Sequence, residues 1–169
     1  MFMQGMHDGV PIALGYFVVS FTLGILAGTA GLSPVQGFVA SWLNFASAGE
    51  YAGFTSIAAH VPFAEIAALT LVANIRYTLM SAALSQRFAP DTPLLHRVAV
   101  TLGVSDEIFG ITVARGGCVE PYYNYGALTV SLPAWSVGTA LGVAAGDVLP
   151  AAALSALSVA LYGMFIWVV

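Results

Sequence analysis

Hydrophobic residues fill long stretches of this chain, and short clusters of proline, glycine and polar residues separate them. Six such stretches stand out, at residues 10–30, 34–59, 62–84, 96–114, 126–146 and 150–169. Each approaches or exceeds the roughly 20 apolar residues that an α-helix needs to cross a bilayer. Their apolar residues occupy odd and even positions alike, whereas a transmembrane β-barrel alternates apolar and polar residues. We therefore predict an all-α, polytopic membrane helical bundle of about six spans, forming a single transmembrane transporter domain over residues 1–169.

Two of these spans have features of interrupted helices. The second carries Asn44, Ser47 and Glu50 near its middle, with Ala48-Gly49 beside the carboxylate. The fourth is interrupted by Ser105-Asp106-Glu107. Non-helical backbone at membrane depth is tolerated where it lines a cavity, and transporters use such broken helices. We expect some spans to be broken or re-entrant, which changes the number of full crossings.

Two short segments of the chain match closely, LGILAG at 23–28 and LGVAAG at 141–146, and a proline opens the next apolar run after each. An internal repeat with a duplicated helix pair is one explanation, since transporters often contain repeats. Chance recurrence of glycine and alanine strings in membrane helices is the other, and we favour it.

The arginines give a first indication of membrane orientation. Arg87 and Arg97 flank the polar loop that follows the third span. The positive-inside rule places this loop in the cytoplasm. With six full crossings the N-terminus then lies outside, and a re-entrant span reverses the argument for one end.

Composition excludes a soluble protein and narrows the function classes. Hydrophobic residues make up 59% of the chain and charged residues 7%, against about a quarter charged in soluble domains. The net charge of -4 comes from few residues, so we expect the lipid bilayer and no nucleic acid as its surroundings. Cys118 has no second cysteine to pair with, and His7, His60 and His96 lie at span ends. There is no zinc-helix, serine-nucleophile or phosphate-loop motif, so we expect no enzyme activity, no cofactor and no metal.

Four ionisable residues lie inside predicted spans, namely Glu50, Arg76, Asp106 and Glu107. Unpaired charge at this depth costs several kcal/mol, so each needs a partner or water. Arg76 lies about ten residues before the third loop and Asp106 about ten after it, which puts both roughly 15 Å into the membrane at 1.5 Å per residue. We therefore predict that Arg76 pairs with Asp106 or Glu107 rather than with Glu50.

Arg76 can neutralise only one acid, so up to two carboxyl groups remain without a fixed cation. Such a group can carry a proton, and the surplus points to a proton-linked or cation-linked transport cycle. A hydrated cavity that merely tolerates the acids is the alternative. We favour the functional interpretation because intramembrane charge is a functional hypothesis by default.

Polar residues also form a stripe on the third span, at Thr70, Asn74, Thr78, Ser81 and Ser85. Their spacing of three or four residues places them on one helix face. For Thr70, Ser81 and Ser85 we favour interhelical hydrogen bonding.

A regular helix separates Asn74 from Arg76 by about 200°, so the two reach one site only if the helix is distorted there. On the second span, small neighbours of Ser47 leave room for a ligand, and close helix packing is an equal alternative. The candidate substrate-binding or proton-coupling residues are Ser47, Glu50, Asn74, Arg76, Asp106 and Glu107.

Five blocks of the sequence together point to a known family. They are DGVPIALGYFVVSFTLGILAGTAGLSP at 8–34, FASAGEY at 45–51, LVANIRYTLMSAAL at 71–84, SDEIFGI at 105–111 and WSVGTALGV at 135–143. In order and spacing they resemble the AzlC-type branched-chain amino acid permease family, over nearly the whole chain. The resemblance implies the larger subunit of an exporter of branched-chain or other small apolar amino acids, multi-pass in a bacterial-type inner membrane. It also implies a small hydrophobic AzlD-type partner subunit or a homo-oligomer.

The chain departs from the family pattern at three points. Glu50 stands where the family usually has glutamine, and Tyr77 where it usually has histidine, so a proton route through that histidine is absent. Family members also generally continue with further hydrophobic segments beyond the position of Val169. Completion by a partner or second copy is one expectation, and a shortened relative is another.

The predicted roles follow the chemistry of a zwitterion. Arg76 takes the substrate carboxylate, Glu50 or Asp106 the ammonium, and apolar walls the branched side chain. Two rival functions stay open at this point. One is a non-transporting structural or truncated membrane subunit, and the other is a proton or ion channel.

Overall fold

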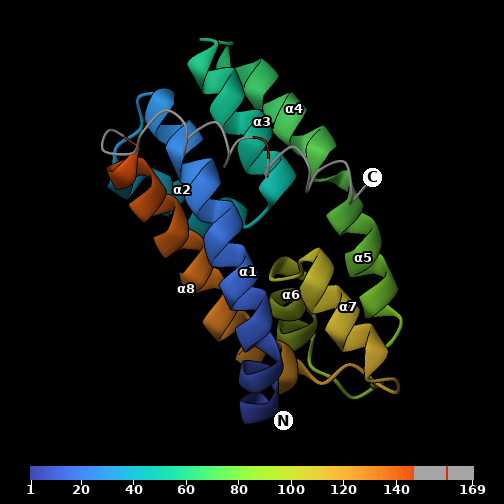
Figure 1. Ribbon diagram of the computed structural model, residues 1–169. Helices are drawn as coiled ribbons and strands as arrows, with labels where there is room; N and C mark the ends of the chain where they lie inside the picture. Colours follow the sequence, from blue (N-terminus) through green and yellow to red (C-terminus); the bar gives the residue numbers. More distant parts are fainter. Residues whose placement is uncertain (147–158, 160–169) are drawn as a thin grey trace.

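The computed structural model describes residues 1–146 and residue 159, so the predicted span at 150–169 lies outside the described residues apart from Val159. The described part is built of α-helices, which confirms the predicted helical membrane bundle (Figure 1). These helices are α1 (Phe2–Thr29), α2 (Pro34–Asn44), α3 (Ser47–Ala58), α4 (Phe63–Ala73), α5 (Ile75–Ser85), α6 (Leu94–Leu102), α7 (Asp106–Ala114) and α8 (Pro121–Ala145).

Three elements of the described part suit a membrane crossing by length and composition. Helices α1 and α8 are each long and apolar enough to cross a membrane on their own. Helices α4 and α5 pass together, as a pair bent by 43° at Asn74. The distortion that Asn74 and Arg76 would need in order to reach one site is therefore present.

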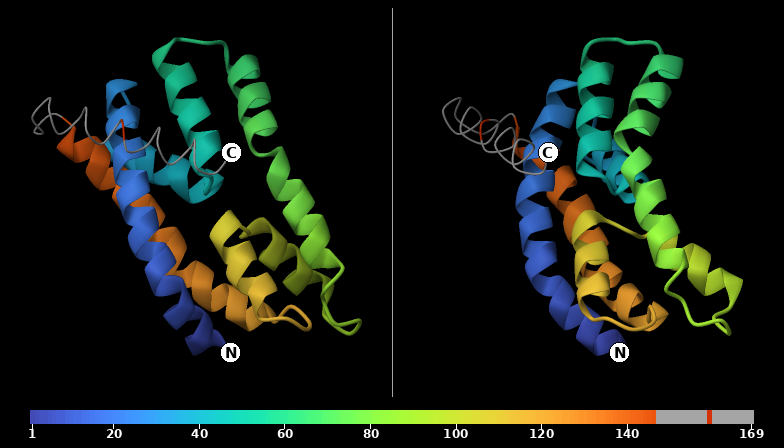
Figure 2. Two further views of the ribbon diagram at one scale, coloured as in Figure 1. Left: turned by 45° about the vertical axis from the view of Figure 1, so that its right-hand side comes forward. Right: turned by 90° about the vertical axis from the view of Figure 1, so that its right-hand side faces the viewer.

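The second predicted span is a re-entrant hairpin, formed by α2 and α3. Helix α2 descends antiparallel to α8, because Gly37 lies against Val143 and Ser41 bonds Thr139. At Phe45 the chain turns back, and α3 returns to the end where α2 began (Figures 1 and 2). Close packing of α3 against α4 brings Gly49 onto Asn74.

The fourth predicted span is a second re-entrant hairpin, formed by α6 and α7. It enters from the opposite end of the bundle and turns back at 103–105 (Figure 2). Ser81 of α5 donates a hydrogen bond to the Thr101 carbonyl of α6, and Thr112 of α7 bonds Asn124 of α8. As full crossings the second and fourth predicted spans are thus wrong, while the expectation of re-entrant spans is met.

Helices α1 and α8 form a close parallel pair. Gly5 lies against Tyr123 near the start of both helices, and Gly24 lies against Gly142 near their ends. A Cβ atom at Gly24 would overlap the Thr139 carbonyl oxygen, so only glycine allows this approach, as at other small-residue interfaces of membrane helices. The matching LGILAG and LGVAAG segments supply Gly24 and Gly142 to this contact.

Three arginines gather at the N-terminal end of the bundle. The Arg115 guanidinium lies 3.4 Å from the Met1 sulfur, and Arg87 donates to the Gly117 carbonyl at 3.3 Å. Arg97 bonds carbonyl groups of the neighbouring loop, including Ala89. The positive-inside rule predicts that this end, and the N-terminus with it, faces the cytoplasm. This is the reverse of the orientation expected from six crossings, because the first hairpin returns to the side it came from and so removes one crossing between the N-terminus and the loop at 85–95.

The glycine contact between α1 and α8 generates a stability prediction. We expect Gly24→Ala to lower the free energy of unfolding by about 1–3 kcal/mol, the usual cost of overpacking. Gly15→Ala on the same helix is the matched control, because a Cβ there meets nothing within 4 Å. The measurement is the thermal unfolding midpoint in detergent. Equal midpoints for both variants would contradict the packing argument.

The orientation is testable with the native thiol. Cys118 is free and exposed, in the loop that precedes α8. We expect a membrane-impermeant maleimide to label it in inside-out vesicles and not in intact cells, because this end faces the cytoplasm. In a Cys118→Ser background, Ala59→Cys at the opposite end should show the reverse pattern. Labelling of Cys118 from outside would overturn the assignment.

Candidate functional site at three helix interruptions

The three helix interruptions meet in the middle of the bundle. The amide nitrogen Nδ2 of Asn74, at the bend of α4 and α5, donates to Oδ1 of Asn44 at the tip of the first hairpin, 2.9 Å away. Two residues further along the chain, Arg76 Nη2 lies 2.9 Å from Asp106 Oδ2 at the tip of the second hairpin. The ion pair predicted from matching depths is therefore present, and it joins α5 to α7.

The start of α7 provides the acids of the site. Ser105 has an extended backbone, and its hydroxyl accepts a hydrogen bond from the Ile108 N–H at 3.3 Å. Asp106 and Glu107 follow in the first turn, where the positive end of the helix dipole favours negative charge. This explains why two acids can stand together at the tip of a membrane hairpin.

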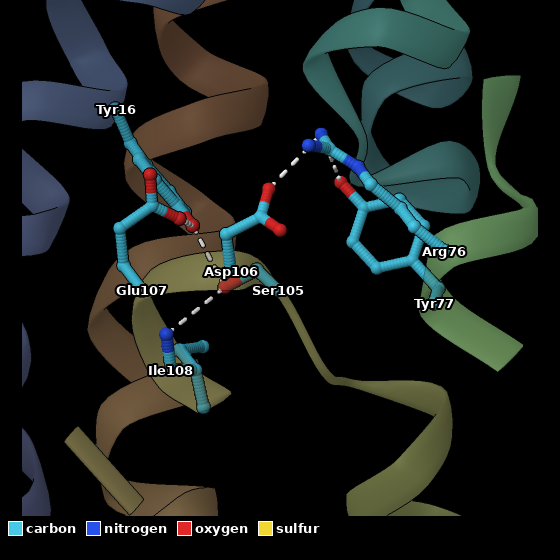
Figure 3. A network of polar contacts seen from close by, with 7 residues as sticks. All are labelled: Tyr16, Arg76, Tyr77, Ser105, Asp106, Glu107 and Ile108. Atoms are coloured by element: carbon cyan, nitrogen blue, oxygen red, sulfur yellow. Dashed lines mark hydrogen bonds and ion pairs between the residues drawn. The ribbon is translucent and has the colours of Figure 1, made fainter. Parts of the chain in front are cut away.

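Glu107 is held by a residue that sequence reasoning missed. The hydroxyl of Tyr16, on α1, forms a short hydrogen bond with the Glu107 carboxylate and also lies 2.7 Å from the Ser105 hydroxyl (Figure 3). Tyr16 is 8% exposed. The available signal was the only tyrosine of the first predicted span, at 10–30.

These groups surround a small central cavity of about 40 Å³. A water molecule needs roughly 10–15 Å³ of such volume, so the cavity has room for about three waters. Three of the predicted site residues line it directly, namely Ser47, Asp106 and Glu107. Its other walls are Tyr16, Val19, Phe45, Tyr77, Ser105 and Trp135.

Arg76 contacts two of the residues that line this cavity, Asp106 and Tyr77. Besides its bridge to Asp106, its Nη2 donates to the Tyr77 hydroxyl at 3.3 Å, and its guanidinium carbon lies 5.2 Å from the Tyr77 ring centroid. Figure 3 places Asp106 between the Arg76 and Tyr77 pair on one side and Tyr16 and Glu107 on the other. The side chains of Arg76 and Asp106 are 33% and 38% exposed, so the pair stays accessible to a ligand.

The acid surplus predicted from sequence has a clear geometry. Arg76 bridges Asp106, whereas Glu107 has hydrogen bonds but no ion pair within the described part of the chain. With one cation and two acids, the central cavity carries an excess negative charge when both acids are ionised. Of the described residues, no group of three or more His, Cys, Asp or Glu side chains could hold a metal ion.

Glu50 lies away from the central cavity, unlike the other predicted acids. It is 2% exposed, accepts a hydrogen bond from the Trp135 Nε1–H at 2.6 Å, and accepts another from the Ser41 hydroxyl at 2.8 Å. The Ser41 oxygen also lies 2.6 Å from the Thr139 hydroxyl. Trp135 separates Glu50 from the cavity, and the whole network fastens the first hairpin to α8.

Comparison with known proteins agrees with the sequence blocks and the fold. The family model described as AzlC protein matches residues 11–149. An uncharacterized membrane protein of Archaeoglobus fulgidus is 33% identical over 88% of this chain and 64% of its own length. The inner membrane protein YgaZ of Escherichia coli K12 is 28% identical over 86% of this chain and 61% of its own length. No solved structure matches the chain.

The chain therefore spans less than two thirds of the length of these relatives. The match over residues 11–149 includes both hairpins, the bent α4 and α5 pair and the central cavity. From its fold, its hydrophobic spans and this match, the chain is a membrane protein that belongs to the AzlC family.

Proposed function

We propose that this chain is a subunit of a secondary transporter that exports branched-chain or other small apolar amino acids from the cytoplasm in exchange for protons. The observation that carries the proposal is the accessible Arg76–Asp106 ion pair, which joins the bend of α4 and α5 to the tip of the second hairpin. Transporters bind their substrates near the bilayer midplane, where discontinuous helices expose polar groups. Membership of the AzlC family agrees with transport of amino acids.

A zwitterionic substrate can replace each partner of this ion pair. The Arg76 guanidinium, with its planar set of donors, suits the substrate carboxylate. Asp106, once released from Arg76, suits the ammonium group. The apolar side chain then packs on the walls that Val19, Phe45 and Trp135 provide, as apolar surfaces do in small-molecule sites.

Glu107 is the group we assign to proton exchange. It borders the central cavity and has no ion pair among the described residues. The titratable or charged groups that face it are Tyr16 from α1, Arg76 and Tyr77 from α5, and Asp106 on its own helix. Uncompensated carboxylate is costly at this depth, so proton uptake by Glu107 removes the excess negative charge that the cavity carries when both acids are ionised.

The proposed setting follows the relatives. We place the chain in an inner membrane of bacterial type, as a multi-pass subunit beside a small hydrophobic AzlD-type partner or a second copy. The Escherichia coli relative is itself named an inner membrane protein. Glu50 has a positioning role in this proposal, because it fixes the first hairpin to α8 from outside the cavity.

Leucine efflux from preloaded proteoliposomes tests the proposal. We expect Arg76→Ala to lower saturable efflux by roughly tenfold or more, because a charge-assisted contact worth about 1.5–3 kcal/mol is lost. Arg115→Ala is the matched control, since it removes the same charge far from the cavity. The assay is run with and without a pH gradient and a small partner subunit.

The same assay separates the proposed roles. Glu107→Gln should keep saturable efflux and lose its response to the pH gradient, because the amide cannot take up a proton. Unchanged efflux in Arg76→Ala would remove the centre of the proposal. Efflux that never saturates would favour a channel. The absence of efflux under every condition would favour a structural subunit.

The positioning role of Glu50 predicts an unusual tolerance. Glu50→Gln should leave efflux and the thermal midpoint close to wild type, because glutamine can accept from Trp135 and donate to Ser41. Glu50→Leu should lower the free energy of unfolding by about 1–3 kcal/mol, since Trp135 Nε1 loses its acceptor. If Glu50→Gln stopped efflux while the midpoint held, Glu50 would belong to the transport path instead.

A further inference from the structure

We propose that a second, outer cavity beside the central one holds the amino acid before it reaches Arg76, and that the Phe45 and Tyr77 rings are the barrier between the two cavities. This inference rests on the proposed function. It adds a binding site and a barrier that the family match does not assign.

The outer cavity is large enough to hold an amino acid and the central cavity is not, as expected if the substrate occupies the outer cavity first. The central cavity, at about 40 Å³, is far smaller than the roughly 150 Å³ cavity that admits benzene in an engineered protein. Leucine has more non-hydrogen atoms than benzene, so it does not fit there in this arrangement. The outer cavity measures about 420 Å³, inside the range of about 300–1,000 Å³ usual for ligand pockets.

The walls of the outer cavity suit a zwitterion with an apolar side chain. Uncharged polar groups line one part, namely Asn44, Asn74, Thr78, Ser81 and Thr101, and the apolar Leu102 and Val104 line another. These lining residues can form hydrogen bonds with the charged ends of the substrate. None of them is charged, so none can form an ion pair with it. Binding there should be weaker than at Arg76, which suits a site of passage.

Phe45 and Tyr77 line both cavities, so their rings stand between them. Phe45 has φ 44° and ψ 43°, a left-handed conformation that is an outlier for a bulky residue and marks stored strain. Its ring packs edge-on against Tyr16 and Trp135, with centroids 5.7 and 6.4 Å apart. A rotation of this side chain joins the two cavities without moving either hairpin from its neighbours.

The outer cavity also reaches the bond that holds the Phe45 tip in place. Asn44 precedes Phe45 and accepts its hydrogen bond from Asn74, and both amides line the cavity. Asn74 Oδ1 is buried and accepts no hydrogen bond from the described residues, although buried polar atoms are normally satisfied. An ammonium or carboxylate in the outer cavity competes for these amides and so loosens the tip.

Thiol labelling of the full chain in proteoliposomes tests the outer site. In a Cys118→Ser background, Thr78→Cys should react with a hydrophilic methanethiosulfonate reagent, and saturating leucine should slow the reaction several-fold while glutamate does not. Leu79→Cys is the matched control, because Leu79 is the next residue on α5, is 72% exposed and does not line the cavity. We expect little reaction there. Ser81→Cys is a second reporter in case Thr78→Cys folds poorly.

A cysteine placed in the central cavity tests the barrier. Ser47→Cys, in the central cavity, should react slowly in the wild-type barrier and many-fold faster when combined with Phe45→Ala. Equal rates with and without Phe45→Ala, or a Thr78→Cys rate unaffected by leucine, would overturn this inference. Such a failure with intact Arg76-dependent efflux leaves the proposed function standing. If leucine slowed labelling of Thr78→Cys but no efflux occurred, the outer binding site would stand and the transport proposal would fail.

Discussion

Backbone and charged groups at the centre of a bilayer must find their partners inside the protein, and this constraint shapes the whole bundle. Three helix interruptions, at Phe45, Asn74 and 103–105, meet this requirement by lying together. The Asn74 amide contacts one hairpin tip, and the ion pair of Arg76 with Asp106 reaches the other. The polar centre and the fold therefore have one cause, since side chains beside one interruption provide hydrogen-bond and charge partners for side chains beside the next.

The parallel pair of α1 and α8 is the frame on which these hairpins are mounted. Glycine contacts bring the two backbones close, and the pair presents Tyr16 and Trp135 to the centre from opposite helices. Trp135 binds the first hairpin through Glu50, while Tyr16 binds the second through Glu107. The first contact is fully buried and the second borders water-sized space. The frame thus anchors the first hairpin through a buried contact and the tip of the second through a contact beside the central cavity.

Much of this could be predicted from residues that act over short distances or at a known depth. Hydrophobic length gave the membrane class, and counting from the third loop paired Arg76 with Asp106. The re-entrant course of 34–59 could not be read in the same way, because length shows that a segment can cross and not where it turns. Phe45 is no usual turn residue, and its left-handed backbone depends on packing against Tyr16 and Trp135. Of the partners of this network, Trp135 lies 85 residues from Glu50 in sequence, and Thr139 lies 98 residues from Ser41, beyond any local pattern.

The charge of the site argues for a zwitterion over a simple ion. The ion pair already places one positive and one negative group in contact, and separating them in a medium of low polarity is costly unless each finds a new partner. An amino acid brings both partners at once, so the number of uncompensated charges does not change when it binds. A lone cation would leave Arg76 unpaired and a lone anion would leave Asp106 unpaired. On charge grounds, the same ion pair that closes the centre of the bundle therefore supports the proposed zwitterionic substrate over a single ion.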